Sequence, residues 1–177
     1  MSAGPNSPAS PKRRWLLKSA LALAAVGGAI GGGVWWRRGF DKQHLTQDGK
    51  SVFRALARGI VGPMLPAAPA ERQAILDRYV VELEKLINTM PSAKRDQISL
   101  LAGALANAPT RYLITARWAS WDEATDDEVR ALLVQLRESS GMAQNATYVA
   151  TRAITCMGFF SIPDNWSLTG YPGPMTI

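Results

Sequence analysis

Apolar side chains recur at steps of three and four residues between positions 75 and 90. The members of this stripe are Ile75, Leu76, Tyr79, Val80, Leu83, Leu86, Ile87 and Met90. An α-helix has about 3.6 residues per turn, so this spacing gathers the side chains on one face, whereas a half-buried strand would alternate with a period of two. Charged residues such as Glu71, Arg72 and Asp77 take the other faces. The segment therefore predicts an amphipathic helix.

Weaker signals of the same kind predict helices along the rest of the chain. Start and stop residues separate them at Asp48, Gly62-Pro63, Pro69, Pro91-Ser92, Asn107-Ala108-Pro109-Thr110, Thr125 and Ser139-Ser140-Gly141. Asp48 and Ser92 are expected to cap two of these helices, and Thr125 with Glu128 forms a capping-box pattern. No segment sustains strand alternation, so we predict an all-α fold with no strand.

Each predicted helix has expected core positions. These are Val52, Phe53, Leu56 and Ile60; Ile98, Leu101, Ala102 and Leu105; Val129, Leu132, Leu133 and Leu136; and Met142, Val149, Ala153, Ile154 and Met157. A further helix is expected to carry Leu113, Ile114 and Arg117 and to continue through Trp118 and Trp121. The two tryptophans would then share a helix face, one of them in the core and the other open to a partner.

The chain divides into five segments by composition. Residues 1–11 predict a disordered start, 12–38 a signal or single transmembrane anchor, 39–47 a polar linker, 48–158 a helical domain and 159–177 a C-terminal docking tail. The domain is expected to be a small bundle of about five helices. The tail is irregular, aromatic and rich in Pro and Gly. An end this apolar either packs on its own helices or docks on another protein.

The basic start of the second segment is followed by an uncharged run. Arg13, Arg14, Leu16, Leu17 and Lys18 precede the 18 uncharged residues Ser19–Trp36. This order resembles a twin-arginine (Tat) export signal, which the translocase reads through the arginine pair. The run has about the minimum length that spans a bilayer. We expect an uncleaved membrane anchor; the alternatives are cleavage near Gly31–Val34 and an ordinary membrane anchor with a basic start.

Charge is concentrated in the same N-terminal region. The first 38 residues hold six of the 20 Lys and Arg residues and none of the 14 acids, so 14 of each remain from residue 39 onward. A nucleic-acid-binding domain would carry its basic excess on the folded part. We therefore expect no nucleic-acid partner, and the net charge of +6 belongs to the export segment.

Few residues suited to catalysis or metal binding are present. His44 is the only histidine and Cys156 the only cysteine, whereas zinc sites and histidine-based triads need several converging ligands. Cys156 is expected to be buried. Asp122, Glu123, Asp126, Asp127 and Glu128 form an acidic cluster, which helix N-termini favour without any catalytic role. The expectation is a chain with no catalytic residue, no metal and no cofactor of its own.

Four motifs occur together in a fixed order. They are Pro109-Thr110-Arg111, then Trp118 and Trp121, then Gly158-Phe159-Phe160, then Trp166 with Gly170-Tyr171-Pro172-Gly173-Pro174. With the twin-arginine leader, this order resembles the small (gamma) subunit family of membrane-bound flavin dehydrogenases, the gluconate 2-dehydrogenase subunit 3 type. The resemblance spans roughly residues 48–174. Phe160 departs from the family's Tyr and supplies no hydroxyl there.

The resemblance implies an accessory role. The partner would be an FAD-containing dehydrogenase of the glucose-methanol-choline (GMC) type, joined in some systems by a c-type cytochrome. This chain would supply export and tether the complex to the periplasmic face of the bacterial inner membrane. The implied contact residues are Arg111, Trp118, Trp121, Phe160, Trp166, Gly170, Tyr171, Pro172, Gly173 and Pro174. Two other readings are an independent envelope enzyme and a membrane-anchored structural protein without a redox partner.

Overall fold

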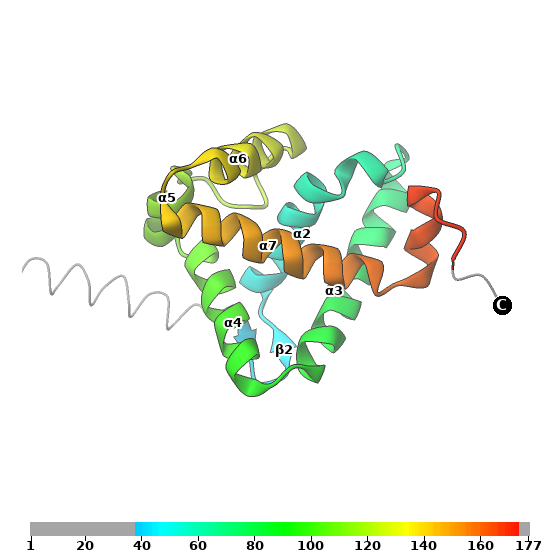
Figure 1. The fold of residues 1–177 in the computed structure, drawn as a ribbon, viewed down its shortest axis with the longest axis horizontal. Coiled ribbons are helices and arrows are strands. Elements are labelled where there is room, and N and C mark those ends of the chain that lie inside the picture. Colours follow the sequence, from blue (N-terminus) through cyan, green and yellow to red (C-terminus); the bar gives the residue numbers. More distant parts are fainter. Residues whose placement is uncertain (1–37, 174–177) are drawn as a thin grey trace, which may run out of the picture.

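The computed structural model describes residues 38–173, and this part of the chain is mostly helical (Figure 1). Its α-helices are α2 (Gln47–Ile60), α3 (Pro69–Thr89), α4 (Ser92–Ala106), α5 (Ala108–Thr115), α6 (Asp126–Glu138) and α7 (Met142–Phe160). Two 3₁₀ helices, η1 (Gly62–Met64) and η2 (Pro163–Thr169), follow α2 and α7. The helical class is confirmed. The predicted disordered start and all of the signal or anchor segment except Arg38 lie outside the described residues.

Helix α2 forms the centre of the packing. It contacts α3, α4, α6 and α7, and its buried residues lie on several sides of the helix. They are Gly49, Val52, Phe53, Ala55, Leu56, Ala57 and Gly59. A helix that is apolar on several sides is expected in the interior of a bundle. Figure 1 shows α7 crossing the molecule along its long axis, with α5 near its N-terminal end and η2 beyond its C-terminal end.

The segment 39–47 is not a linker, and the prediction of no strand was wrong. Strands β1 (Phe40–Asp41) and β2 (His44–Leu45) pair antiparallel, with Phe40 opposite Leu45. Both of these side chains are buried in the core. Strands of two residues are too short to show alternation in a sequence. The hairpin also moves the cap of α2 to Thr46, whose hydroxyl accepts from the Gly49 N–H, instead of the expected Asp48.

Glu84 on α3 holds this hairpin against the bundle. Its carboxylate accepts hydrogen bonds from the Leu45 N–H at 2.7 Å and from the His44 ring at 3.0 Å. Burial opposes ionisation of Glu84, but these two hydrogen bonds outweigh it and lower the pKa of the carboxyl. The lowered pKa means that the folded state favours the ionised form. This stability is present above the unfolded pKa and is lost as pH falls through the folded pKa.

Replacing Glu84 with Gln is therefore expected to destabilise the protein in a pH-dependent way. At pH 7 the free energy of unfolding should fall by about 1 kcal/mol, the usual contribution of a hydrogen bond of this kind. The difference should begin to shrink as pH falls below the ordinary pKa of Glu and should disappear only below the lowered pKa of the folded-state carboxyl. Urea unfolding at pH 7, 5 and 3.5 measures this difference. A gap that stays constant with pH would contradict the role assigned to the ionised carboxylate.

Helix α3 confirms the strongest sequence prediction. It begins at Pro69, as the proline at a first helical position indicated, and it buries Leu76, Tyr79, Val80, Leu83 and Ile87. Helix α6 confirms the capping box, because the Thr125 side chain and Glu128 cap each other's backbone. It also buries all four predicted core residues. Helix α4 begins as expected at Ser92, but Pro91 occupies the cap position.

The core face of α7 differs from the predicted one. Only Ile154 of the expected apolar stripe is buried, while Met142, Val149 and Met157 are exposed. The buried face instead consists of Thr147, Thr151, Ile154, Thr155, Gly158 and Phe159. A helical threonine can bury its hydroxyl by bonding to its own helix. Thr147 and Thr151 do so, donating to the carbonyl oxygens four residues earlier.

Gly158 allows α7 to approach α3 closely. A Cβ at this position would lie 2.9 Å from Leu83 Cδ1 and 3.1 Å from Tyr79 Cε2. The absence of a side chain therefore sets the distance between the two helices.

Replacing Gly158 with Val is expected to lower the free energy of unfolding by about 2 kcal/mol, because overpacking displaces core side chains. The control is Ala150→Val on the exposed face of the same helix, with an expected change below about 1 kcal/mol. Thermal unfolding followed by circular dichroism compares the two. Equal thermal unfolding midpoints of Gly158→Val and Ala150→Val would show that α3 and α7 can move apart without a loss of stability.

Candidate functional site

The predicted contact residues fall into two groups at opposite ends of the molecule. Arg111, Trp118 and Trp121 lie on α5 and in the loop after it, and the others lie at the C-terminal end of α7 and beyond (Figure 1). Helix α7, with 19 residues, is about 28 Å long. The structure therefore does not bring these residues together in one surface.

Arg111 is a structural residue of the interior. It is only 5% exposed, so its side chain is not available on the surface as a contact residue. Its guanidinium donates to the carbonyl oxygens of Ala106 at 2.7 Å and of Trp118 at 2.6 Å, with longer bonds to those of Leu105 and Arg117. The fork geometry of arginine suits several acceptors at once. Arg111 thus ties the end of α4 to the loop after α5.

The helix expected to reach Trp121 ends at Thr115. Ala116 adopts a left-handed conformation with φ of 55°, and the chain continues as a loop. Trp118 and Trp121 therefore do not share a helix face. Trp121 is 3% exposed and donates its indole N–H to the Leu105 carbonyl at 2.7 Å. Trp118 is 58% exposed, which confirms the prediction that one tryptophan is in the core and the other open.

Trp118 belongs to an exposed cluster that we call the aromatic platform, formed by Tyr112, Leu113 and Trp118. The Tyr112 and Trp118 rings stack with centroids 4.7 Å apart. All three side chains are exposed. Tyr112 is not among the predicted contact residues, and Leu113 was expected on a longer helix. The sequence does contain an indication of this cluster, because Tyr112-Leu113-Ile114 is a run of three large apolar residues. A short helix can bury only one of its faces, so some of these side chains must stay exposed.

A polar pocket of about 250 Å³ lies between the start of α2 and the loop after α5. Asp48, Ser51, Asn107, Arg111 and Asp122 contribute to its wall. The Ser51 hydroxyl donates to the Asp122 carboxylate at 2.6 Å. Carboxylates, a hydroxyl and an amide at an open pocket can hold water and other polar groups.

The first half of the C-terminal segment packs on its own domain. Ile162 and Asn165 are buried, and the Asn165 amide donates to the Phe159 carbonyl at 2.8 Å. Phe160 is half-buried and meets Phe159 edge-on. Trp166 is also half-buried, and its indole N–H donates to the Phe160 carbonyl at 2.8 Å. These residues anchor the segment to α7.

The second half of the segment is exposed. Gly170 ends η2 with φ of 74°, a left-handed conformation that favours glycine. Tyr171 follows, half exposed, with its ring 5.8 Å from that of Trp166. Pro172 is exposed, and Gly173, with φ of 96°, lies against the Trp166 ring. Pro174 and the residues of the predicted Tat signal, Arg13, Arg14, Leu16, Leu17 and Lys18, lie outside the described residues.

Two buried hydroxyls lie between α3 and α7. Tyr79 Oη and Thr155 Oγ1 have no hydrogen-bond partner within residues 38–173. Burial raises the pKa of Tyr79 above its usual range, and the nearby Thr155 hydroxyl opposes that shift only weakly. Cys156, expected to be buried, is partly exposed on the outer side of α7. Tyr79 and Thr155 are fully buried and are core residues.

Searches of the described residues for metal ligands and membrane spans gave no candidates. No group of three or more His, Cys, Asp or Glu side chains in residues 38–173 could hold a metal ion. No helix in the same range is both long and apolar enough to cross a membrane. Comparisons with protein-family models, curated proteins and solved structures found no match.

Proposed function

We propose that this chain is the non-catalytic small subunit of a periplasmic, membrane-bound flavin dehydrogenase. In this proposal residues 12–38 are the Tat signal and membrane anchor. The helical domain binds a partner that carries FAD and performs the oxidation, with a c-type cytochrome as a further subunit. The motif order ending in Gly170-Tyr171-Pro172-Gly173-Pro174 is the observation on which the proposal rests.

The exposed aromatic side chains support a binding role. Tyr and Trp are enriched at binding hot spots, since each offers a large rigid surface with a polar tip. Trp118 on the aromatic platform and Tyr171 beyond η2 meet this description. Arg111, Trp121 and Trp166 instead donate hydrogen bonds to backbone carbonyls within the domain. The contact residues proposed for the partner therefore narrow to Tyr112, Leu113, Trp118, Tyr171 and Pro172.

The test is isolation of the tagged full-length protein in mild detergent, with visible absorbance and mass spectrometry of what accompanies it. We expect a yellow complex containing a GMC-type flavoprotein. A colourless protein recovered alone would contradict the proposal and favour the alternative, an envelope protein with a structural role and no redox partner.

The double variant Trp118→Ala/Tyr171→Ala is expected to lose most of the bound flavoprotein without a loss of helical content. Truncating a hot-spot aromatic costs about 2 kcal/mol or more of binding energy. The matched control is Val81→Ala, which removes an equally exposed apolar side chain from α3. Flavin absorbance per mole of tagged chain measures how much flavoprotein stays bound to the double variant and to the control. Equal flavin content in the double variant and the control would remove these two residues from the interface.

A further inference from the structure

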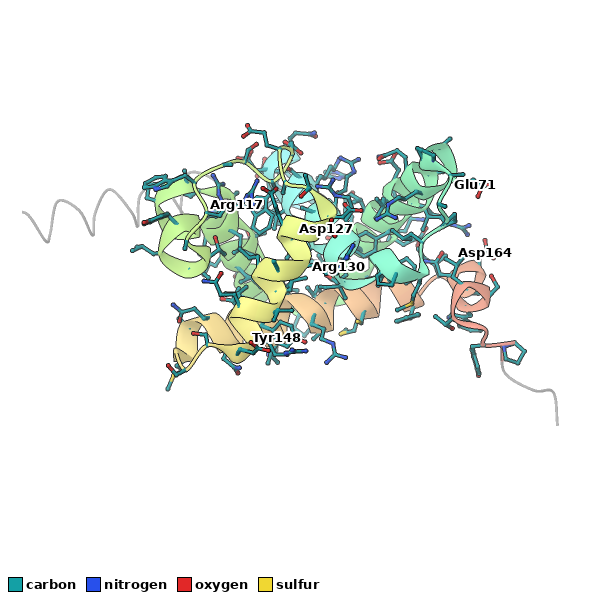
Figure 2. All side chains as sticks on the ribbon, turned by 90° about the horizontal axis from the view of Figure 1, so that it is seen from above. Glu71, Arg117, Asp127, Arg130, Tyr148 and Asp164 are labelled. Atoms are coloured by element: carbon teal, nitrogen blue, oxygen red, sulfur yellow. The ribbon has the colours of Figure 1, made fainter. Side chains whose placement is uncertain are left out.

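A pocket of about 170 Å³ between α6 and α7 carries an unusual concentration of positive charge. Arg130 and Arg137 of α6 and Arg152 of α7 line it, together with Tyr148 and the apolar Ile60 and Leu133. No acidic residue of the described chain lines this pocket. Figure 2 shows Arg130 near the middle of the molecule and Tyr148 at its lower edge, both away from Asp164 towards the right-hand end.

Acidic side chains neutralise the positive charge of these three arginines only weakly. Arg130 pairs with Asp127 and Arg137 with Glu138, each at 3.0 Å along the same helix. Asp127 is 88% and Glu138 65% exposed, and pairs between exposed side chains contribute little to stability. Arg152 makes no hydrogen bond or ion pair within residues 38–173. The chain from residue 39 onward has equal numbers of acids and bases, so this excess is local.

An apolar hollow continues from this pocket along α7. Tyr148 and Arg152 line both, and Val149, Ala153 and Cys156 complete the second, which has a volume of about 370 Å³. The exposed side of α7 also includes Met142 and Met157, and Arg152 is the only charged residue of this helix. We call the two pockets together the α6–α7 groove. Its apolar face is turned to solvent because the threonines of α7 occupy the core.

We infer that the α6–α7 groove binds an acidic amphipathic segment of another polypeptide. The carboxylates of that segment would meet the guanidinium groups, which form paired hydrogen bonds with carboxylates. Its apolar side chains would cover Val149, Ala153 and the sulfur of Cys156. An amphipathic helix laid in an apolar groove is a recurring mode of peptide recognition, and the charged rim fixes its orientation. This inference holds whether or not the partner is a flavoprotein.

The groove shares no lining residue with the aromatic platform or with Tyr171, so it can be varied independently of them. The full-length protein is produced in its native cells with a photo-crosslinking p-benzoyl-phenylalanine in place of Val149. After illumination, the adduct is purified through a tag and the cross-linked peptide is identified by mass spectrometry. We expect one adduct with another protein, through a peptide that carries both Asp or Glu and large apolar residues.

A charge-reversal variant tests whether the arginines of the groove contribute to binding. Arg137→Glu/Arg152→Glu in the crosslinking protein is expected to reduce the adduct about tenfold or more, as coupling between close charge pairs across an interface implies. The matched control is Lys94→Glu/Arg95→Glu at the start of α4, which reverses the same charge elsewhere and should leave the yield unchanged. Circular dichroism of both variants confirms equal folding.

Any one of several results would overturn the inference. They are no adduct at Val149, an adduct through a peptide without acidic residues, an adduct with lipid, and a yield that charge reversal leaves unchanged. An adduct of twice the mass of the chain would assign the groove to self-association and would equally overturn it.

Discussion

Replacing Arg13 and Arg14 with lysine is expected to leave both this protein and the flavoprotein proposed as its partner in the cytoplasm. Lysine keeps the positive charge but lacks the planar fork of donors that distinguishes arginine. A receptor that reads the pair by shape therefore loses its recognition element while the charge of the segment stays the same. Cell fractionation with antibodies to both subunits measures the distribution. We expect near-complete loss of both from the periplasmic face.

The control for this variant is the same exchange at the other end of the apolar run, Arg37→Lys/Arg38→Lys, which should leave export intact. Normal export of the flavoprotein despite retention of this chain would contradict the idea that the partner travels bound to it. Normal export of both proteins would show that residues 12–38 act as an ordinary membrane anchor.

Replacing Arg111 with Ala is expected to cause the largest loss of stability among single substitutions in the domain, about 3 kcal/mol. The substitution removes the donors from the carbonyls of Ala106 and Trp118, which then stay buried without them. It also leaves a cavity where a side chain is only 5% exposed. Urea unfolding followed by circular dichroism measures the change.

Two further variants separate the causes. Arg111→Lys retains the charge and most of the volume but cannot reach several carbonyls at once, so its stability should lie between wild type and Arg111→Ala. Lys94→Ala, at an exposed position in the first turn of α4, should change the free energy of unfolding by less than about 0.5 kcal/mol. An unfolding midpoint of Arg111→Ala equal to that of wild type would show that these carbonyls find other donors.

The parts of the fold that were predicted correctly have local causes. The buried side of α3 follows from its apolar spacing, and its start follows from Pro69. The start of α6 follows from Thr125 and Glu128, three residues apart. In each case the residues that produce the structure are neighbours in the chain, so a short stretch of sequence contains the whole cause.

The predictions that failed depend on distant residues. Ser99, far along the chain, holds the hairpin by accepting from the Phe40 N–H at 3.1 Å. The loop that carries Trp121 is fixed by the Leu105 carbonyl, sixteen residues earlier. The side of α7 that faces the core is set by α2, α3 and α6. Thr147 and Thr151 can lie on that side because their hydroxyls donate to carbonyl oxygens of the same helix.

The sequence by itself determined the helical class, the start of α3 and the cap of α6, and it indicated which residues were candidates for contact with a partner. Only the tertiary structure decided which of those candidates are available. Arg111 and Trp121 became interior supports, Trp166 became half-buried, and Trp118 and Tyr171 stayed exposed. The physical reason is that caps and helical periodicity act over a few residues, whereas burial depends on which other helices cover a side chain.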